Sequence, residues 1–223
     1  MEIVIVLGGP NTKEDIKPLL ENRYAKAYED FRFVGVDGGA LRLLDQHLPM
    51  EVAIGDFDSV TKEQRDLIHE AATTVVQLPC EKDDTDFEAA LLWVKEHYEG
   101  VPIHVLGSFG GRVDHAISTL WTMMRPDLAP LIPYVVFEDA TNVVNFIQPG
   151  TYTIEKMDFT KYLSFISMTP VENLTLQNVK YTLDSKNYAY PVAFVSNEFT
   201  GDKMTISFTK GLILVAQTRD HWR

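Results

Sequence analysis

The sequence predicts an α/β domain with a mainly parallel sheet, followed by an all-β sandwich. Over residues 1–138, a short apolar run, a turn rich in glycine or aspartate, and an amphipathic segment follow one another repeatedly. Parallel strands joined by helical crossovers give this pattern. From residue 139 onward, short β-like runs separated by turn residues replace it, as in sandwiches and flattened barrels. We therefore expect two domains, 1–138 and 139–223.

The first domain contains five predicted strands, at residues 3–7, 32–36, 51–54, 74–78 and 103–106. Amphipathic segments between them predict helices at about residues 12–30, 40–47 and 61–72. A fourth helix begins at Thr85, because Thr85 and Glu88 have the spacing of a capping box. Its apolar side chains Phe87, Leu91 and Val94 then recur on one helical face. This alternation of strand and helix is typical of a Rossmann-like domain.

The second domain contains predicted strands at residues 143–147, 152–155, 163–168, 171–176, 193–196, 204–208 and 212–216. Turn residues such as Pro149-Gly150 and Gly201-Asp202 separate them. Because no helix pattern lies between these strands, we expect a sandwich or a flattened barrel.

Composition narrows the class of protein. The 223 residues are 45% hydrophobic, which is enough to bury a core, and the formal net charge is -12. A nucleic-acid binder normally presents a basic surface, so nucleic acid is not an expected partner. No run of about 18 apolar residues predicts a membrane span. The single cysteine, Cys80, excludes an internal disulfide and a thiolate metal cluster, so we expect a cytoplasmic protein.

Acidic or glycine-rich turns follow the predicted strands of the first domain. These turns contain Gly8 and Gly9, Asp37, Asp56 and Asp58, Asp83, Asp84 and Asp86, and the pair Arg112 and Asp114. The carboxyl ends of parallel strands meet at one edge of a sheet, so these side chains are expected to converge. Crowded carboxylates repel one another unless a cation neutralises them, and Mg²⁺ prefers oxygen ligands. The alternative for each aspartate is an ordinary turn or helix cap.

The segment Gly107-Ser108-Phe109-Gly110-Gly111-Arg112 is a candidate phosphate-binding loop. Glycines allow backbone N–H groups to approach an anion, and a helix follows with its positive end. That helix is predicted from an apolar stripe, Val113, Ile117, Leu120 and Met124. Arg112 suits phosphate oxygens, and its alternative is an ion pair with a nearby acid. Lys82 is a second candidate phosphate contact, with a solvated lysine as its alternative.

These motifs together resemble the thiamine pyrophosphokinase family. The motifs that carry the resemblance are Val36-Asp37-Gly38-Gly39-Ala40, Gly55-Asp56-Phe57-Asp58-Ser59, Asp83-Asp84-Thr85-Asp86-Phe87-Glu88, residues 107–115, Asn178-Val179-Lys180-Tyr181-Thr182-Leu183 and Val195-Ser196-Asn197-Glu198-Phe199. They occur in the family's order and spacing. Two positions depart from the family: Leu41 stands where many members have Asn, and Val179 replaces a frequent Leu.

The resemblance implies transfer of the diphosphoryl group of ATP to the hydroxyl of thiamine, giving thiamine diphosphate and AMP. It implies a homodimer whose active site lies at the subunit interface. The implied metal ligands for Mg²⁺ are Asp56, Asp58 and Asp86, which with Arg112 form the implied catalytic set. The implied ATP contacts are Asp37, Gly38, Asp83, Thr85, Gly110, Gly111 and Asp114. The implied thiamine contacts are Tyr181, Ser196 and Asn197.

The residues leave other functions open. Thiamine is a cation, which suits an aromatic face such as that of Tyr181, although Tyr181 could instead be a packed aromatic of the sandwich. A haloacid-dehalogenase-like phosphatase would use Asp56 in its Asp-x-Asp motif as a nucleophile. A non-catalytic nucleotide or thiamine sensor would keep the pocket without turnover. The products formed from Mg·ATP and thiamine separate these three functions.

Overall fold

The computed structural model describes residues 1–9, 16–81 and 83–220, which belong to two compact units, Met1–Ala140 and Thr141–Arg223. The first is an α/β unit with parallel strand pairing, and the second pairs its strands in antiparallel fashion, so the predicted fold class is confirmed. The predicted helix start near residue 12 and the candidate phosphate contact Lys82 lie outside the described residues.

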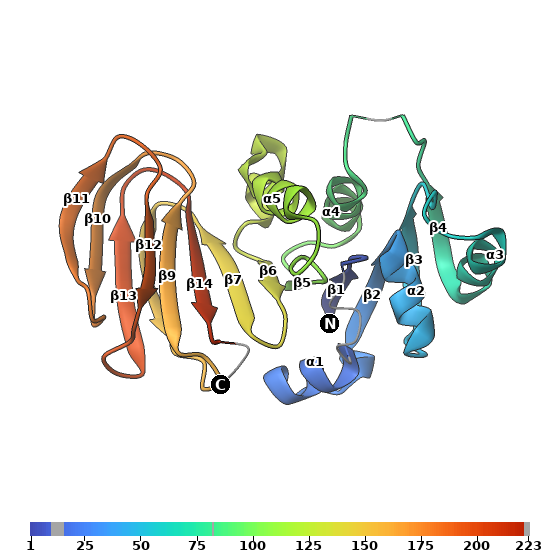
Figure 1. Cartoon of the computed structure of the whole chain (residues 1–223), viewed down its shortest axis with the longest axis horizontal. Coiled ribbons are helices and arrows are strands. Elements are labelled where there is room, and N and C mark those ends of the chain that lie inside the picture. The colour runs from blue at the N-terminus through green and yellow to red at the C-terminus, as the bar shows by residue number, and fades with distance from the viewer. Residues whose placement is uncertain (10–15, 82, 221–223) are drawn as a thin grey trace. The chain divides into compact units, whose positions relative to one another are not determined.

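Strands of the first unit are β1 (Glu2–Val6), β2 (Phe31–Val36), β3 (Met50–Gly55), β4 (Ala72–Gln77), β5 (Ile103–Leu106) and β6 (Val135–Glu138). Its helices are α1 (Ile16–Tyr24), α2 (Gly38–Asp45), α3 (Lys62–Ala71), α4 (Asp86–His97) and α5 (Val113–Trp121), with 3-10 helices η1 (Tyr28–Asp30), η2 (Thr122–Met124) and η3 (Pro126–Leu131). The strands lie in the order β6-β5-β1-β2-β3-β4 (Figure 1).

This strand order has a switch point between β1 and β5. The chain proceeds outward from β1 through β2 and β3 to β4, and then returns to the other side of β1 with β5 and β6. In open α/β sheets, ligands bind outside the carboxyl ends of the strands near such a switch. The loops that leave the carboxyl ends of β1, β2, β3 and β5 are therefore the ones expected to form a site.

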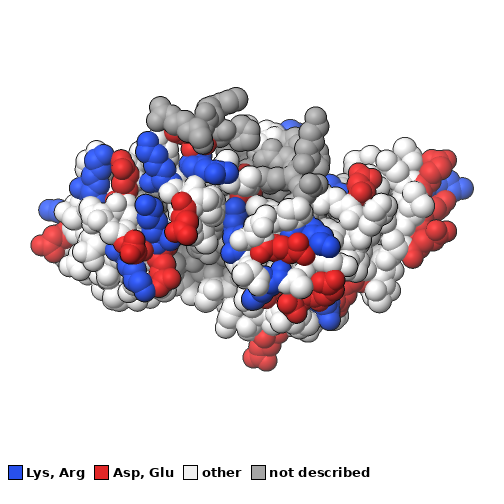
Figure 2. All heavy atoms as spheres, turned by 90° about the horizontal axis from the view of Figure 1, so that it is seen from below, with Lys and Arg blue, Asp and Glu red and all other residues white. Residues whose placement is uncertain are grey.

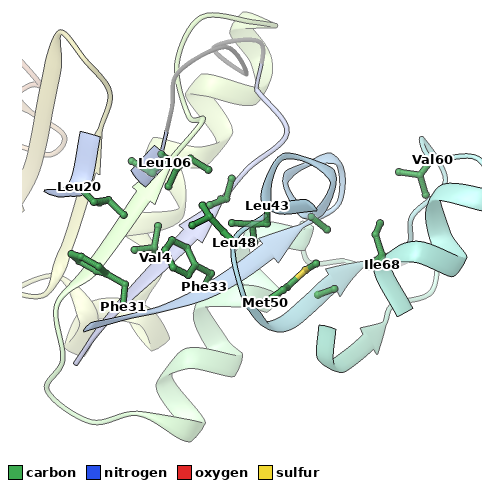
Figure 3. Close-up of a cluster of buried hydrophobic side chains, with 14 of the residues drawn as sticks. Val4, Leu20, Phe31, Phe33, Leu43, Leu48, Met50, Val60, Ile68 and Leu106 are labelled. Carbon is green, nitrogen blue, oxygen red and sulfur yellow. The ribbon is translucent and has the colours of Figure 1, made fainter. Parts of the chain in front are cut away.

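The central strands are buried because both faces of the sheet are covered. Side chains alternate between the two faces of a strand, so Val4 and Val6 of β1 face one side. There they pack with Phe33 of β2 and with Leu20 and Leu43 of helices α1 and α2 (Figure 3). On the other side α4 packs against β2 and β3, and Phe87 meets Phe137 at 5.9 Å between ring centroids.

A buried polar network joins α1 to strands β5 and β6. The Glu138 carboxylate is fully buried and accepts hydrogen bonds from Arg23 Nη1 at 2.5 Å and from the Tyr24 hydroxyl at 2.9 Å. His104 Nδ1 lies 2.9 Å from Glu138, and His104 Nε2 lies 3.1 Å from Glu2. Burial alone would raise the pKa of Glu138, but its bonds to His104 and Arg23 hold it below the ordinary value. A buried carboxylate such as that of Glu138 is tolerated only when it is paired and hydrogen-bonded.

The apolar stripe on α5 does not face the core of its unit. Val113 is 72% exposed, Ile117 is 48% exposed and Trp121 is 56% exposed. The helix predicted from the apolar stripe is therefore present as α5, but the stripe residues Val113 and Ile117 are exposed and not packed in the core. Helical spacing identified the helix correctly, but it does not indicate what the apolar face contacts.

Strands of the second unit are β7 (Asn142–Ile147), β8 (Gly150–Glu155), β9 (Tyr162–Ser167), β10 (Val171–Gln177), β11 (Leu183–Tyr188), β12 (Ala193–Asn197), β13 (Lys203–Phe208) and β14 (Ile213–Thr218). One sheet contains β12-β9-β14-β7 and the other β11-β10-β13-β8. Side chains from both sheets share one core, including Phe165, Leu176, Ile206 and Val215. This is the packing of a sandwich.

Two strands escaped prediction. β11 has the sequence LDSKNY, and its side chains are exposed or half-buried, so it lacks the apolar alternation on which strand prediction depends. β6 lies directly before the predicted domain boundary.

No helix among the described residues is long and apolar enough to span a bilayer. On the face shown in Figure 2, basic side chains are interspersed with acidic ones.

Candidate active site

Three carboxylates from separate loops converge in the first unit. Asp37 directly follows β2, Asp56 follows β3, and Asp86 is the first residue of α4. One carboxylate oxygen from each lies within 4.8 Å of the others, and all three side chains are half-buried. We call Asp37, Asp56 and Asp86 the three-carboxylate group. Its oxygen donors are the type that Mg²⁺ prefers.

The backbone around Asp37 is built to hold its side chain against β3. Asp37 has φ +47° and ψ -122°, which lies outside the left-handed helical region and is a conformation that residues with a side chain rarely adopt. Its N–H donates to the carbonyl of Ile54 at 3.0 Å, and its carbonyl accepts from the N–H of Ala40 at 2.9 Å. A Cβ at Gly55 would lie 2.1 Å from Asp37 Oδ1. Glycine at position 55 therefore makes room for the Asp37 carboxylate.

The loop after β3 is anchored by a buried aromatic ring. Phe57 is fully buried, and its N–H donates to Asp37 Oδ1 at 3.3 Å. Its carbonyl accepts from Arg65 Nη2 of α3 at 2.9 Å. The N–H of Asp58 donates to Asp56 Oδ1 at 3.1 Å, but the Asp58 side chain is exposed and lies outside the three-carboxylate group.

The start of α4 is fixed by the predicted capping box. Thr85 Oγ1 accepts from the N–H of Glu88 at 3.2 Å, and Glu88 Oε2 accepts from the N–H of Thr85 at 2.8 Å. The capping-box prediction is thereby confirmed. Asp86 follows the cap in the first turn, where the positive end of the helix favours a carboxylate.

The proximity of the three acids changes their electrostatics. Burial, then the charge of Asp86 and a hydrogen bond with it, and finally the charge of Asp56 raise the pKa of Asp37 to about 7. The bond from the N–H of Phe57 opposes this increase. A cation bound among the three carboxylates would favour their ionised forms and lower this pKa.

The glycine-rich loop after β5 presents its predicted ATP contacts at the surface. Gly110, Gly111, Arg112 and Asp114 are all exposed. Arg112 Nη2 donates to Asp114 Oδ2 at 2.6 Å, and Arg112 Nε donates to Asp114 Oδ1 at 3.2 Å. This contact holds the pKa of Asp114 below its ordinary value. The structure thus contains the ion pair that was the alternative for Arg112.

The loops after β1 and β5 touch through their backbones at the switch point. A Cβ at Gly9 would lie 2.0 Å from the carbonyl oxygen of Gly107, so a larger residue at position 9 would force the loops apart. Ser108 is buried beside this contact, and its Oγ has no hydrogen-bond partner among the described residues. Asp83 and Gly38, two other predicted ATP contacts, lie near the starts of α4 and α2.

The second unit contains a pocket of about 330 Å³ between strands β10, β11 and β12. Its walls include Leu176, Tyr181, Leu183, Phe194 and Asn197. The Tyr181 N–H donates to Asn197 Oδ1 at 2.9 Å, and Asn197 Nδ2 donates to the Tyr181 carbonyl at 2.9 Å. Asn197 is 2% exposed and the Tyr181 side chain is 60% exposed. A buried amide therefore holds an exposed ring at the pocket.

Ser196 is next to this pocket. Its φ is +60°, its side chain is exposed, and its N–H donates to Ser164 Oγ at 3.2 Å. The structure thus brings two of the three predicted thiamine contacts, Tyr181 and Asn197, into one pocket and places Ser196 beside them.

Two family models match the chain in succession. Residues 27–133 match "Thiamin pyrophosphokinase, catalytic domain", and residues 151–213 match "Thiamin pyrophosphokinase, vitamin B1 binding domain". The thiamine pyrophosphokinase of Bacillus subtilis (strain 168) is 32% identical over 220 residues, which cover 98% of this chain and 99% of that protein. The chain belongs to the thiamine pyrophosphokinase family.

Solved structures of the family agree with this assignment. A thiamin pyrophosphokinase family protein from Enterococcus faecalis is 35% identical and has a TM-score of 0.89, covering 99% of this chain and 100% of that chain. The Bacillus subtilis thiamine pyrophosphokinase is 32% identical with a TM-score of 0.82, covering 99% of this chain and 100% of that chain. The predicted family is thus confirmed.

Sequence reasoning did not foresee several features of this family member's site. Asp37, predicted as a nucleotide contact, lies in the three-carboxylate group, whereas Asp58, predicted as a metal ligand, lies outside it. Arg65 supports the Phe57 carbonyl but was not singled out. Its position four residues after the N-cap Thr61 is an ordinary helix position, so the sequence gives no indication of that contact.

The raised pKa of Asp37 predicts how pH affects stability. The pKa is about 7 in the folded protein and about 4 in an unfolded chain, so folding favours the protonated form. The free energy of unfolding should therefore fall as pH rises from about 4 to about 7. We expect the metal-free Asp37→Asn variant to melt at a higher temperature than the wild type at pH 8, and at a similar temperature at pH 4.

Thermal melting of both proteins across this pH range checks the prediction. The difference between the two curves at each pH cancels the other titrating groups. An unchanged difference between pH 4 and pH 8 would show that Asp37 is ionised normally in the folded protein.

Proposed function

We propose that the chain transfers the diphosphoryl group of ATP to the hydroxyl of thiamine, forming thiamine diphosphate and AMP. The observation that carries this function is the pairing of two sites with the two family matches. The three-carboxylate group lies within residues 27–133, and the pocket of Tyr181 and Asn197 lies within residues 151–213. We assign residues 1–138 to nucleotide and metal binding, and residues 139–223 to thiamine binding and dimerisation.

We propose that Asp56, Asp86 and Asp58 hold Mg²⁺ together with the triphosphate, with Asp37 beside them. The donor set fits this ion, because its ligands are carboxylate oxygens and their mutual repulsion is relieved by a cation. Mg²⁺ normally takes one or two protein carboxylates and fills its other positions with water and phosphate oxygens. The exposed Asp58 is accordingly assigned beside the two ligands Asp56 and Asp86.

In this reaction the thiamine hydroxyl oxygen attacks the β-phosphorus of ATP. The bond from that phosphorus to the oxygen bridging to the α-phosphate breaks, AMP leaves and the hydroxyl proton is released. Bound Mg²⁺ supplies neutralisation of the phosphate charge. Phosphoryl transfer usually has a loose transition state, so the protein mainly positions the reactants and stabilises charge.

Arg112 is proposed to contribute its fork to the phosphate oxygens. In the structure the fork is occupied by Asp114, but both side chains are exposed, and an exposed ion pair costs little to exchange for a phosphate. The exposed backbone at Gly110 and Gly111 and the capped helix start at Thr85 are proposed as further ATP contacts. Asp37, Gly38, Asp83 and Asp114 complete the proposed set.

For thiamine, the proposed contact is the exposed face of Tyr181. The ring attracts the thiazolium cation through its quadrupole, and the pocket beside it supplies apolar side chains for the rest of the ligand. Ser196 is proposed as a hydroxyl contact at the pocket margin.

Incubation with Mg·ATP and thiamine, followed by separation of the products, tests this function. Thiamine diphosphate with an equal amount of AMP is the expected result. Free phosphate without AMP would instead indicate a phosphatase, and thiamine binding without products would indicate a sensor. Either of those two results would contradict the proposed reaction.

We also propose that the chain acts in the cytoplasm as a homodimer whose active site lies at the subunit interface. Specific activity is then expected to fall as the protein is diluted toward the monomer. Sedimentation analysis at each assay concentration gives the fraction of dimer. A monomer with full specific activity would contradict the shared site.

A further inference from the structure

Arg125 lies at the centre of a charged cluster with Asp84, Glu88 and Asp127. It stands between η2 and η3, where its N–H donates to the Thr122 carbonyl at 3.1 Å and its carbonyl accepts from the Leu128 N–H at 3.2 Å. Thr122 and Leu128 are buried. The backbone of Arg125 is therefore fixed in place, and its side chain is 28% exposed.

The guanidinium group of Arg125 is oriented by one acid so that it contacts two others. Nε and Nη2 donate to the two oxygens of Asp127, at 3.1 and 2.8 Å. This bidentate contact directs Nη1 toward the loop before α4, where it donates to Asp84 Oδ1 at 2.5 Å and lies 3.3 Å from Glu88 Oε1. Bidentate pairs of this kind fix direction as well as distance.

Both acids reached by Nη1 flank Asp86 in the sequence. Asp84 lies two residues before Asp86, and Glu88 lies two residues after it. Glu88 contacts Arg125 through Oε1 and closes the capping box of α4 through Oε2, which accepts from the N–H of Thr85. A continuous series of contacts therefore runs from Arg125 through Glu88 to the first turn of α4.

We propose that Arg125 is a positioning residue for the metal site: it ties Asp84 and Glu88 together so that Asp86 faces Asp37 and Asp56. The consequence of this positioning for catalysis rests on the proposed function. Arg125 itself touches no reacting group and is not one of the assigned ligands. Residues 83–88 contain four carboxylates, and without Arg125 two of these, Asp84 and Glu88, would lose this cationic partner.

The charge of Arg125 and its positioning role predict opposite results. A cation close to a metal site repels the metal, so removing only the charge would strengthen binding of a divalent cation. Loss of positioning would weaken that binding, because Asp86 would no longer be held beside the other two carboxylates. The direction of the change therefore identifies the role.

The test uses Mn²⁺ as the probe, with free Mn²⁺ measured by electron paramagnetic resonance in the absence of ATP and thiamine. Arg125→Gln is expected to raise the Kd for Mn²⁺ about ten-fold. Arg125→Lys is expected to give a smaller increase, because lysine restores the charge without the planar fork. Arg32→Gln is the matched control, since Arg32 pairs with Glu51 near the start of β2, at the opposite end of that strand from Asp37.

A double variant tests whether the effect passes through Asp84. If Arg125 acts by holding Asp84, the double variant Arg125→Gln with Asp84→Asn should bind Mn²⁺ about as weakly as Arg125→Gln alone. Melting temperatures of the metal-free variants show that each remains folded. In the product assay, Arg125→Gln should require more Mg²⁺ for half-maximal rate.

Three results would overturn the inference: wild-type or tighter Mn²⁺ binding by Arg125→Gln, an equal loss in Arg32→Gln, or purely additive effects of the two substitutions. Mn²⁺ binding does not depend on product formation. A wild-type protein that forms no thiamine diphosphate would therefore contradict the proposed function alone, and the role of Arg125 would still be measured.

Discussion

Asp86→Asn is expected to lower kcat roughly 10³-fold while leaving the chain folded. Asparagine has the same shape but no charge, so the three-carboxylate group loses one of its ionic donors. Removing one preorganised electrostatic contact to a transition state typically costs about 10²–10³ in rate. A direct metal ligand should lie at the upper end of this range, which corresponds to about 4 kcal/mol of transition-state stabilisation.

The fold should survive because the helix cap does not depend on Asp86. The bonds of the capping box join Thr85 and Glu88, and both remain in the variant. Loss of the Asp86 charge also removes a source of repulsion for Asp37, so the metal-free variant should not melt earlier than the wild type. Loss of helical structure in this variant would contradict that expectation.

Initial rates over a range of Mg²⁺ concentrations measure the effect. Asp66→Asn is the matched control, because Asp66 is an exposed aspartate of α3 outside the three-carboxylate group, and it should keep the wild-type rate. Asp58→Asn is also expected to cut turnover, because Asp58 is a proposed ligand. Wild-type turnover in Asp58→Asn would contradict its assignment as a metal ligand. Wild-type turnover in Asp86→Asn would contradict the assignment of the metal site to the three-carboxylate group.

The sequence predicted the features that follow from local rules. Strand and helix periodicity gave the α/β unit followed by a β unit, and the spacing of Thr85 and Glu88 gave the start of α4. Convergence of loops at the carboxyl ends of parallel strands is a property of the topology, so the sequence alone predicts that the acidic turns of the first unit meet.

The features that escaped prediction depend on contacts between distant residues. Asp37 and Asp58 both follow strands, but the absent side chain at Gly55 leaves space for the Asp37 carboxylate, whereas Asp58 follows the buried Phe57 and is exposed. Arg125 is separated from Asp84 by 41 residues. No periodicity or spacing in the chain indicates such a pair.

The two candidate sites differ in how they are held. In the first unit, turns, a helix cap and the buried Phe57 hold three carboxylates close together, so a cation bound among them would act on all three. In the second unit, the backbone of the exposed Tyr181 is held by one hydrogen bond to, and one from, the neutral, buried amide of Asn197. Substitutions at the second site should therefore change affinity for one substrate without changing the electrostatics of the first.

Asn197→Ala is expected to raise the KM for thiamine roughly 10- to 100-fold, with little change in kcat or in the KM for ATP. Alanine removes the acceptor for the N–H groups of Tyr181 and Glu198 and the donor to the Tyr181 carbonyl. An unsatisfied buried polar group costs about 1–3 kcal/mol. Thiamine binding would then have to supply the free energy that places Tyr181 at the pocket. Each 1.4 kcal/mol of this free energy weakens thiamine binding about ten-fold.

A rise in KM at constant kcat indicates loss of binding that is equal in the ground and transition states. Asn187→Ala is the matched control, because Asn187 Oδ1 accepts a backbone N–H from Asn173 at 2.7 Å in the same unit and neither residue is among those that line the pocket. Tyr181→Phe should keep a near-wild-type KM, since the ring face remains, and Tyr181→Ala should reproduce the effect of Asn197→Ala. An unchanged thiamine KM in Asn197→Ala, or an equal rise in Asn187→Ala, would show that this amide does not place the thiamine contact.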